Sequence, residues 1–136
     1  MRVTADTNIY VSALQYGGHP KRFLDMARDG AFELCISPPI LDGMSRVLRD
    51  KFHRTPEEVA EARELISSFT TMVEPARQLD VVKEDPTDNQ VLECALASGS
   101  RAVISGDRHL LRIGRHEAIE ILKVSDFLSR RQGMLR

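Results

Sequence analysis

The sequence predicts an α/β protein with a mainly parallel central sheet. Short apolar segments that suit buried strands alternate with longer segments whose apolar residues recur at helical spacing. This alternation is typical of parallel strands connected by helices. The chain has 136 residues and shows no internal repeat, low-complexity tract or linker, so we expect residues 1–136 to form one domain.

The first half of the chain is punctuated by proline and glycine. Gly17-Gly18-His19-Pro20 separates two helices, and Ser37-Pro38-Pro39 begins a third with Ser37 as its cap. Thr55-Pro56-Glu57-Glu58 is a capping box that begins a fourth helix. We expect the third and fourth helices to form an antiparallel hairpin over one side of the sheet. The elements expected here are strands at 3–5 and 32–36, and helices at 8–14, 20–28, 38–48 and 56–69.

The second half continues the same alternation. A short strand at 71–73 is followed by a polar, irregular segment at 75–86. Thr87 and Gln90 form a second capping box, and the helix that it begins ends at Gly99. The remaining expected elements are a strand at 102–105, a short helical turn around 110–111, a strand at 118–122 and a helix at 125–132.

The composition is that of an ordinary soluble protein. The chain is 42% hydrophobic, with 19 basic and 20 acidic residues. This balance neither favours nor excludes nucleic acid, so a polyanion would require locally clustered basic residues. Cys35 and Cys94 form no metal motif, and we interpret both as buried side chains in a reducing compartment. No segment indicates a signal peptide or a membrane span, so we expect a cytoplasmic protein.

Three acids occupy comparable positions. Asp6 ends the first strand, Asp88 lies in the first turn of a helix, and Asp107 follows the strand at 102–105. Ligands of an open parallel sheet bind beyond the carboxyl ends of its strands, so we expect the three acids to meet there. Grouped carboxylates repel one another unless a cation or protons compensate. Mg²⁺ prefers a few carboxylates with waters and substrate phosphates, and such a site supports displacement at phosphorus.

Each acid also has a simpler interpretation. Asp6 could only cap the following helix, Asp88 could only interact with a helix dipole, and Asp107 could be a turn residue. The matching placement of all three favours a metal site.

These segments resemble the motifs of PIN-domain proteins. Asp6-Thr7-Asn8 is similar to the first motif, and the segment from Ser37 to Leu48 resembles the helix of the second. The segments 85–89 and 104–111 resemble the third and fourth. The resemblance covers nearly the whole chain and is nearest to the toxins of toxin–antitoxin systems (VapC-like). It implies a three-layer αβα sandwich, Mg²⁺- or Mn²⁺-dependent cleavage of RNA, frequent homodimers and inhibition by a cognate antitoxin protein.

The resemblance also implies roles for single residues. Asp6, Asp88 and Asp107 match family acids that hold metal, which makes them the catalytic and metal-binding candidates. Asn8 and Ser105 match polar residues that commonly support the first and last of these acids.

Two positions depart from the family pattern. The family typically has a glutamate where this chain has Gly43. Asp42 lies next to it, but one residue along a helix is a rotation of about 100°. We therefore expect Asp42 to pair with Arg46 at i+4. The alternative is that the carboxylate of Asp42 reaches the site through a water or a locally unwound turn and supports it. His109 stands where a further acid is common, and we interpret it as an exposed rim residue rather than a metal ligand or proton shuttle.

The three acids predict a metal site, and the resemblance implies that the protein is a metal-dependent ribonuclease, the toxin of a toxin–antitoxin pair. Gly43 and His109 motivate the alternative of an impaired module that binds RNA or an antitoxin without efficient cleavage. An aspartyl-phosphate enzyme is a third hypothesis, disfavoured because no second acid stands beside Asp6. Clustered basic residues could contact RNA phosphates, although each could equally be a solvated helix face. They are Arg46, Arg49, Lys51, Arg54, Arg101, Arg108, Arg112, Arg115, Arg130, Arg131 and Arg136.

Overall fold

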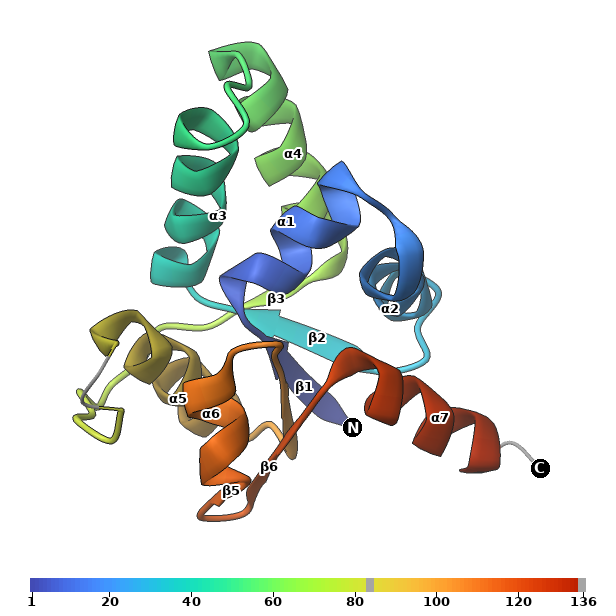
Figure 1. Cartoon of the computed structure of the whole chain (residues 1–136), viewed down its shortest axis with the longest axis vertical. Helices are drawn as coiled ribbons and strands as arrows, with labels where there is room; N and C mark the ends of the chain where they lie inside the picture. The colour runs from blue at the N-terminus through green and yellow to red at the C-terminus, as the bar shows by residue number, and fades with distance from the viewer. Residues whose placement is uncertain (83–84, 135–136) are drawn as a thin grey trace.

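The computed structural model describes residues 1–82 and 85–134, in which helices flank a six-stranded sheet (Figure 1). The strands are β1 (Arg2–Ala5), β2 (Glu33–Ile36), β3 (Thr71–Met72), β4 (Ala102–Ile104), β5 (Arg115–His116) and β6 (Ile119–Leu122). The helices are α1 (Thr7–Gln15), α2 (Gly18–Arg28), α3 (Pro38–Asp50), α4 (Pro56–Phe69), α5 (Pro86–Ser98), α6 (Arg108–Ile113) and α7 (Val124–Met134).

The strand order contains one reversal. The order is β3-β2-β1-β4-β6-β5, and every neighbouring pair is parallel except β5 with β6. The chain runs outward from β1 to β2 and β3, and then returns to place β4 on the other side of β1. The carboxyl ends of β1 and β4 therefore form the topological switch point, where open α/β sheets bind their ligands.

Helices cover both faces of this sheet, which confirms the three-layer αβα sandwich. Helix α5 packs on β1, β2 and β4, and α6 packs on β6. Helices α1 and α2 contact each other, α7 packs on α2, and these helices lie on the other side (Figure 1). This division follows from right-handed crossovers, because the chain crosses the sheet in one direction before β3 and in the opposite direction after it.

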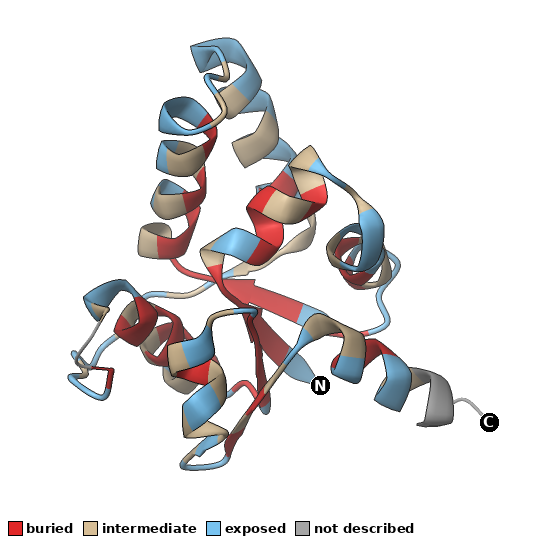
Figure 2. Ribbon diagram, viewed as in Figure 1, coloured by how far each residue is buried: buried red, intermediate tan, exposed pale blue. Residues whose placement is uncertain are grey.

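The core lies between the sheet and these helices (Figure 2). The inner strands are buried on both faces and are accordingly almost continuously apolar, as in Leu34-Cys35-Ile36. Phe23, Phe32 and Phe127 pack in a ring, with centroids 5.0 to 5.5 Å apart, and join α2 to α7. Cys35 and Cys94 are free and buried, as predicted.

Helices α3 and α4 form the predicted hairpin, but the expectation that it covers the sheet is wrong. The two helices contact each other, and α3 packs against α1 and α5. The hairpin projects beyond the carboxyl edge of the sheet (Figure 1). Only Ile66 of α4 is buried, so α4 has too narrow an apolar stripe to cover a sheet face.

One of the two predicted capping boxes is confirmed. Thr55 Oγ1 accepts a hydrogen bond from the N–H of Glu58, whose side chain accepts one from the N–H of Thr55. The box predicted at Thr87 and Gln90 is wrong, because α5 begins two residues earlier with Asp85 as its cap. Pro86 explains the difference, since a residue without an N–H fits the first helical position and leaves the preceding residue as the cap.

Other differences from the sequence predictions are small. Helix α2 begins at Gly18 rather than at Pro20, and the edge strand β5 was not predicted. Strand β5 has only two residues, which is too short to show the alternation of apolar and polar residues from which a strand is predicted. Residues 83 and 84 of the predicted irregular segment, and Arg136 of the clustered basic residues, lie outside the described residues. In the described part of the chain, no helix is both long and apolar enough to cross a bilayer.

Candidate functional site

Asp6, Ser105 and Asp107 meet at the topological switch point. The N–H of Asp6 donates to the carbonyl of Ile104 at 3.0 Å, which fixes the end of β1 against the end of β4. Ser105 Oγ donates to Asp6 Oδ2 and accepts from the N–H of Asp107 at 2.9 Å. Ser105 is fully buried and connects the first and last of the predicted acids, which is the position expected of a supporting residue.

Asp88 and Asp107 lie in a group with an acid that was not predicted. Carboxylate oxygens of Asp85, Asp88 and Asp107 all lie within 4.8 Å of one another, and we call these three residues the acid cluster. Asp88 is only 6% exposed, and its Oδ2 is buried without a hydrogen-bond partner among the described residues. Asp85 was overlooked because the cap of α5 was placed at Thr87; Pro86 was the signal that could have identified it.

The acids also lie at helix N-termini, as the simpler interpretations of Asp6 and Asp88 predicted, whereas Asp107, whose simpler interpretation was a turn residue, caps a helix. Asp6 Oδ1 accepts from the N–H of Ile9 at 3.1 Å and caps α1. Asp107 Oδ1 accepts from His109 and Leu110 at 2.8 and 3.2 Å and caps α6. Capping does not exclude a role in the site, because each carboxylate oxygen has two lone pairs and can accept more than one interaction. The positive ends of three helices offset part of the repulsion among the acids.

Burial and mutual repulsion change the pKa values of these acids. Asp6 is 5% exposed. Its burial, and to a lesser extent the charge of Asp107, raises its pKa to about 6, against the lowering effect of the Ser105 hydrogen bond. Burial and then the proximity of Asp107 raise the pKa of Asp88 to about 7. Burial opposes ionisation of Asp107, but backbone N–H groups of Leu110 and His109 and the neighbouring Asp88 lower its pKa overall.

Two asparagines near the acids differ in their roles. Asn8 lies exposed in the first turn of α1, where its backbone N–H lowers the pKa of Asp6. Asn89 is buried in α5, and sequence reasoning missed it. Its Oδ1 accepts from the N–H groups of Val81 and Val82 at 2.8 and 2.9 Å, and its Nδ2 donates to the carbonyl of Val82. Asn89 therefore holds the preceding loop against the helix that carries Asp88.

The side chain of Asp42 does not join the acids and is instead bound by a residue of α4. Its side chain is 62% exposed and accepts from Arg63 of α4 at 3.0 Å. The predicted pairing with Arg46 is therefore wrong, because the hairpin supplies a partner from the neighbouring helix. Gly43 instead faces Thr7, the residue after Asp6. A Cβ at Gly43 would lie 3.0 Å from Thr7 Oγ1, so glycine permits this close approach of α3 to α1.

His109 is half-buried, so the expectation of an exposed rim residue is wrong. Its Nδ1 is buried without a partner among the described residues. The side chain lines a cavity of about 190 Å³ beside the acid cluster, together with Val81, Val82, Arg112 and Ile113.

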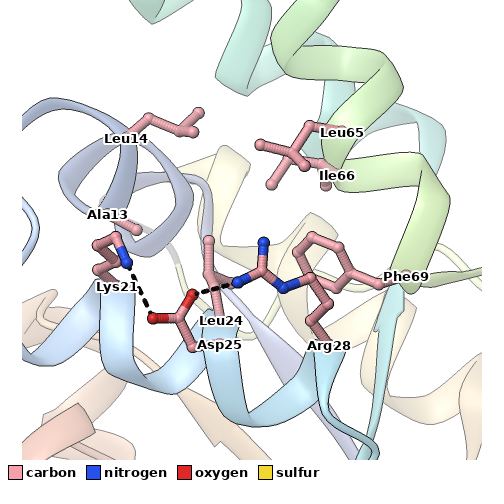
Figure 3. Close-up of a pocket in the computed structure, with 9 residues that line it drawn as sticks. All are labelled: Ala13, Leu14, Lys21, Leu24, Asp25, Arg28, Leu65, Ile66 and Phe69. Atoms are coloured by element: carbon pink, nitrogen blue, oxygen red, sulfur yellow. Dashed lines mark hydrogen bonds and ion pairs between the residues drawn. The ribbon is translucent and has the colours of Figure 1, made fainter.

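A separate apolar groove lies away from the acids, between α1, α2 and α4 (Figure 3). Leu14 of α1 lies across it from Leu65 and Ile66 of α4 (Figure 3). On its rim, Asp25 accepts from Lys21 and Arg28 at 2.9 and 3.2 Å, so these two cations are already paired. The groove lacks the grouped carboxylates of the switch point.

The comparisons with known proteins agree with this geometry. A family model described as a PIN domain matches residues 2–109. The chain belongs to the PIN domain family. Among solved structures, it resembles a chain in the crystal structure of VapBC2 from Rickettsia felis bound to a DNA fragment from its promoter. The identity is 13% and the TM-score is 0.67, over 90% of this chain and 98% of the other. No curated protein sequence matches the chain.

The donor set of this PIN domain fits a hard divalent cation. The acid cluster offers only carboxylate oxygens, which Mg²⁺ and Mn²⁺ prefer to nitrogen or sulfur. The unpartnered Oδ2 of Asp88 is a buried acceptor that lacks a donor, and such an atom is costly to leave unsatisfied. A cation would satisfy this oxygen and remove the repulsion that raises the pKa of Asp88.

Proposed function

We propose that this PIN domain is a Mg²⁺- or Mn²⁺-dependent endoribonuclease and the toxin of a toxin–antitoxin pair. The observation that carries the proposal is the buried, unpartnered carboxylate oxygen of Asp88, in a group of acids at the switch point of the sheet. Asp85, Asp88 and Asp107 would hold the ion, with Asp6 beside them. When bound, the ion supplies a Lewis acid for the phosphodiester and lowers the pKa of water.

The chain's own residues keep the acids in place. Ser105 orients Asp6 and joins it to the backbone of Asp107. Asn89 fixes the loop before α5, which forms one wall of the cavity beside the cluster. Arg112 and His109 line the same cavity and would contact RNA phosphates in the proposed complex.

The remaining parts of the proposal rest on family membership and fold likeness. We propose a cognate antitoxin as the protein partner, by analogy with a VapBC complex of the same fold. We also propose that the chain forms a homodimer and acts in the cytoplasm.

Cleavage of RNA tests this function directly. We expect hydrolysis of single-stranded RNA with Mg²⁺ or Mn²⁺, loss on chelation, and a decrease of at least about a hundredfold in Asp6→Asn. Asp29→Asn is the matched control, because Asp29 is exposed before β2, at the opposite edge of the sheet. Cleavage that survives both chelation and Asp6→Asn would exclude the metal mechanism.

A second candidate is the impaired module that binds RNA or an antitoxin without efficient turnover. The observation that favours it is Gly43, which presents no carboxylate on the helix facing Thr7. Gly43→Glu tests it in a Thr7→Ala background, which removes the side chain that a Cβ at 43 would meet. A large gain in cleavage over Thr7→Ala alone indicates an impaired chain, whereas no gain indicates that the acid cluster is sufficient.

A further inference from the structure

A second charged site lies at the opposite edge of the sheet. Arg101 precedes β4, Glu120 lies in the first half of β6, and Met1 precedes β1, so the site lies toward the amino ends of the parallel strands. A cavity of about 320 Å³ opens there, beside α7. It is lined by Met1, Arg101, Ala102, Arg115, Ala118, Glu120, Leu122, Phe127, Arg130 and Arg131. We call this cavity the arginine pocket.

The charge of the arginine pocket is strongly unbalanced. Among the described residues that line it, four are arginines and one, Glu120, is an acid. Arg130 donates to Glu120 at 2.7 Å, and Arg115, which lies opposite Glu120 in the β5–β6 pair, is attracted to the same carboxylate. Arg101 and Arg115 are exposed and make no salt bridge within the described part of the chain. The excess of cations stands out on a chain whose formal net charge is −1 and favours an anionic ligand.

One arginine of the pocket is already held in position. Arg131 donates to the carbonyl of Ala31, and its guanidinium lies 5.6 Å from the centre of the Phe32 ring. A guanidinium that is fixed in this way loses less conformational entropy when it binds an anion.

The floor of the pocket is apolar. Ala102 and Phe127 are buried at its base, and Ala118 and Leu122 are apolar lining residues that remain accessible. The volume lies within the range of small-molecule sites. Guanidinium groups bind phosphate oxygens in pairs, and an apolar floor suits the flat face of a base.

We propose that the arginine pocket binds the phosphate group of a nucleotide, with the base or ribose against the apolar lining that Ala118 and Leu122 present. The nucleotide is either free or part of an RNA chain. This site is distinct from the acid cluster and does not depend on nuclease activity.

Calorimetry of the full chain in chelator, with inorganic phosphate, adenosine 5′-monophosphate or a short single-stranded RNA, tests the proposal. We expect the nucleotide to bind at least about tenfold more tightly than inorganic phosphate, because the base covers apolar surface. Binding of the free nucleotide identifies a nucleotide site, and binding of RNA alone identifies a chain phosphate. In either case, Arg101→Gln with Arg115→Gln should weaken binding by at least about tenfold.

Two further variants make the test specific. Lys21→Gln with Arg22→Gln removes the same charge from exposed residues outside the pocket and should change affinity by less than about twofold. Glu120→Gln removes the acid that lines the pocket and should strengthen binding by about two- to fivefold, a gain that loss of structure does not produce. Circular dichroism checks that each variant is folded. The proposal is overturned if none of the three probes binds, if both double variants weaken binding equally, or if Glu120→Gln weakens it.

Discussion

Asp88 shows how a single side chain connects stability to function in this PIN domain. Its Oδ2 is buried without a donor, and its pKa is raised to about 7 by burial and by Asp107. A residue that destabilises the protein in this way without a ligand is typical of a binding site. The acid cluster therefore stores unfavourable electrostatic energy that a cation can release.

The stability of the metal-free protein should depend on pH through Asp6. Its pKa rises from 3.8 to about 6 on folding, so the folded state holds a proton that the unfolded state releases. The free energy of unfolding should therefore fall as pH rises from about 4 to about 7, by about 3 kcal/mol for this group. Thermal melts in chelator measure this slope.

Asp6→Asn is the variant that isolates this effect. Because the amide does not ionise, the slope should flatten, and the variant should be more stable than the wild type near neutral pH. Added Mg²⁺ should raise the wild-type melting temperature at neutral pH. A slope that is unchanged in Asp6→Asn contradicts the assignment to Asp6.

The side chain of Thr7 should limit which residues are tolerated at position 43. Alanine in a helix is favoured over glycine by about 1 kcal/mol, but a Cβ at this position would lie 3.0 Å from Thr7 Oγ1. We expect Gly43→Ala to be at least about 1 kcal/mol more favourable in a Thr7→Ala background than in the wild type. Denaturant unfolding of the four proteins in this cycle measures the coupling, and additive effects contradict a close approach of α3 to α1.

Single residues also mark where the sequence was insufficient. Strand and turn patterns predict Ser105 at the end of β4, whereas its hydrogen bonds to Asp6 and Asp107 arise only on folding. Asp42 was paired with the wrong arginine because its partner, Arg63, belongs to another helix and is found only after folding. The half-burial of His109 likewise depends on a loop held by Asn89.

At the scale of elements, local signals predicted the helices and strands well where capping chemistry was unambiguous. Thr55 and Glu58 form the box that their spacing predicts. Asp85 and Thr87 both have capping side chains, and only the position of Pro86 distinguishes them. The packing of the α3–α4 hairpin on α1 could not be predicted, because hydrophobic periodicity identifies a buried face but not what covers it.

The capping box should make a measurable contribution to α4. Thr55→Ala removes the acceptor of the Glu58 N–H and should lower the free energy of unfolding by about 1 kcal/mol. Ser67→Ala, in the exposed last turn of the same helix, should change it by less than about 0.5 kcal/mol. Urea unfolding compares the two variants, and equal effects would show that the box adds nothing to α4.

At the scale of the whole molecule, the strand order brings the acids together. Asp6 follows β1 and Asp107 follows β4, and these strands are neighbours although about a hundred residues separate them. The alternation of strands and helices predicted the fold class and the edge at which the acids meet. It could not predict Asp85 in the cluster or an arginine pocket at the other edge, because both depend on side-chain positions.

Calorimetric titration of the metal-free protein with Mg²⁺ and Mn²⁺ tests the central claim, that the acid cluster holds a divalent cation, most directly. We expect saturable binding to the wild type, loss of at least about tenfold in affinity in Asp88→Asn and in Asp107→Asn, and no change in Asp29→Asn. Failure of the wild type to bind either ion at millimolar concentration, or equal binding by all four proteins, would contradict it.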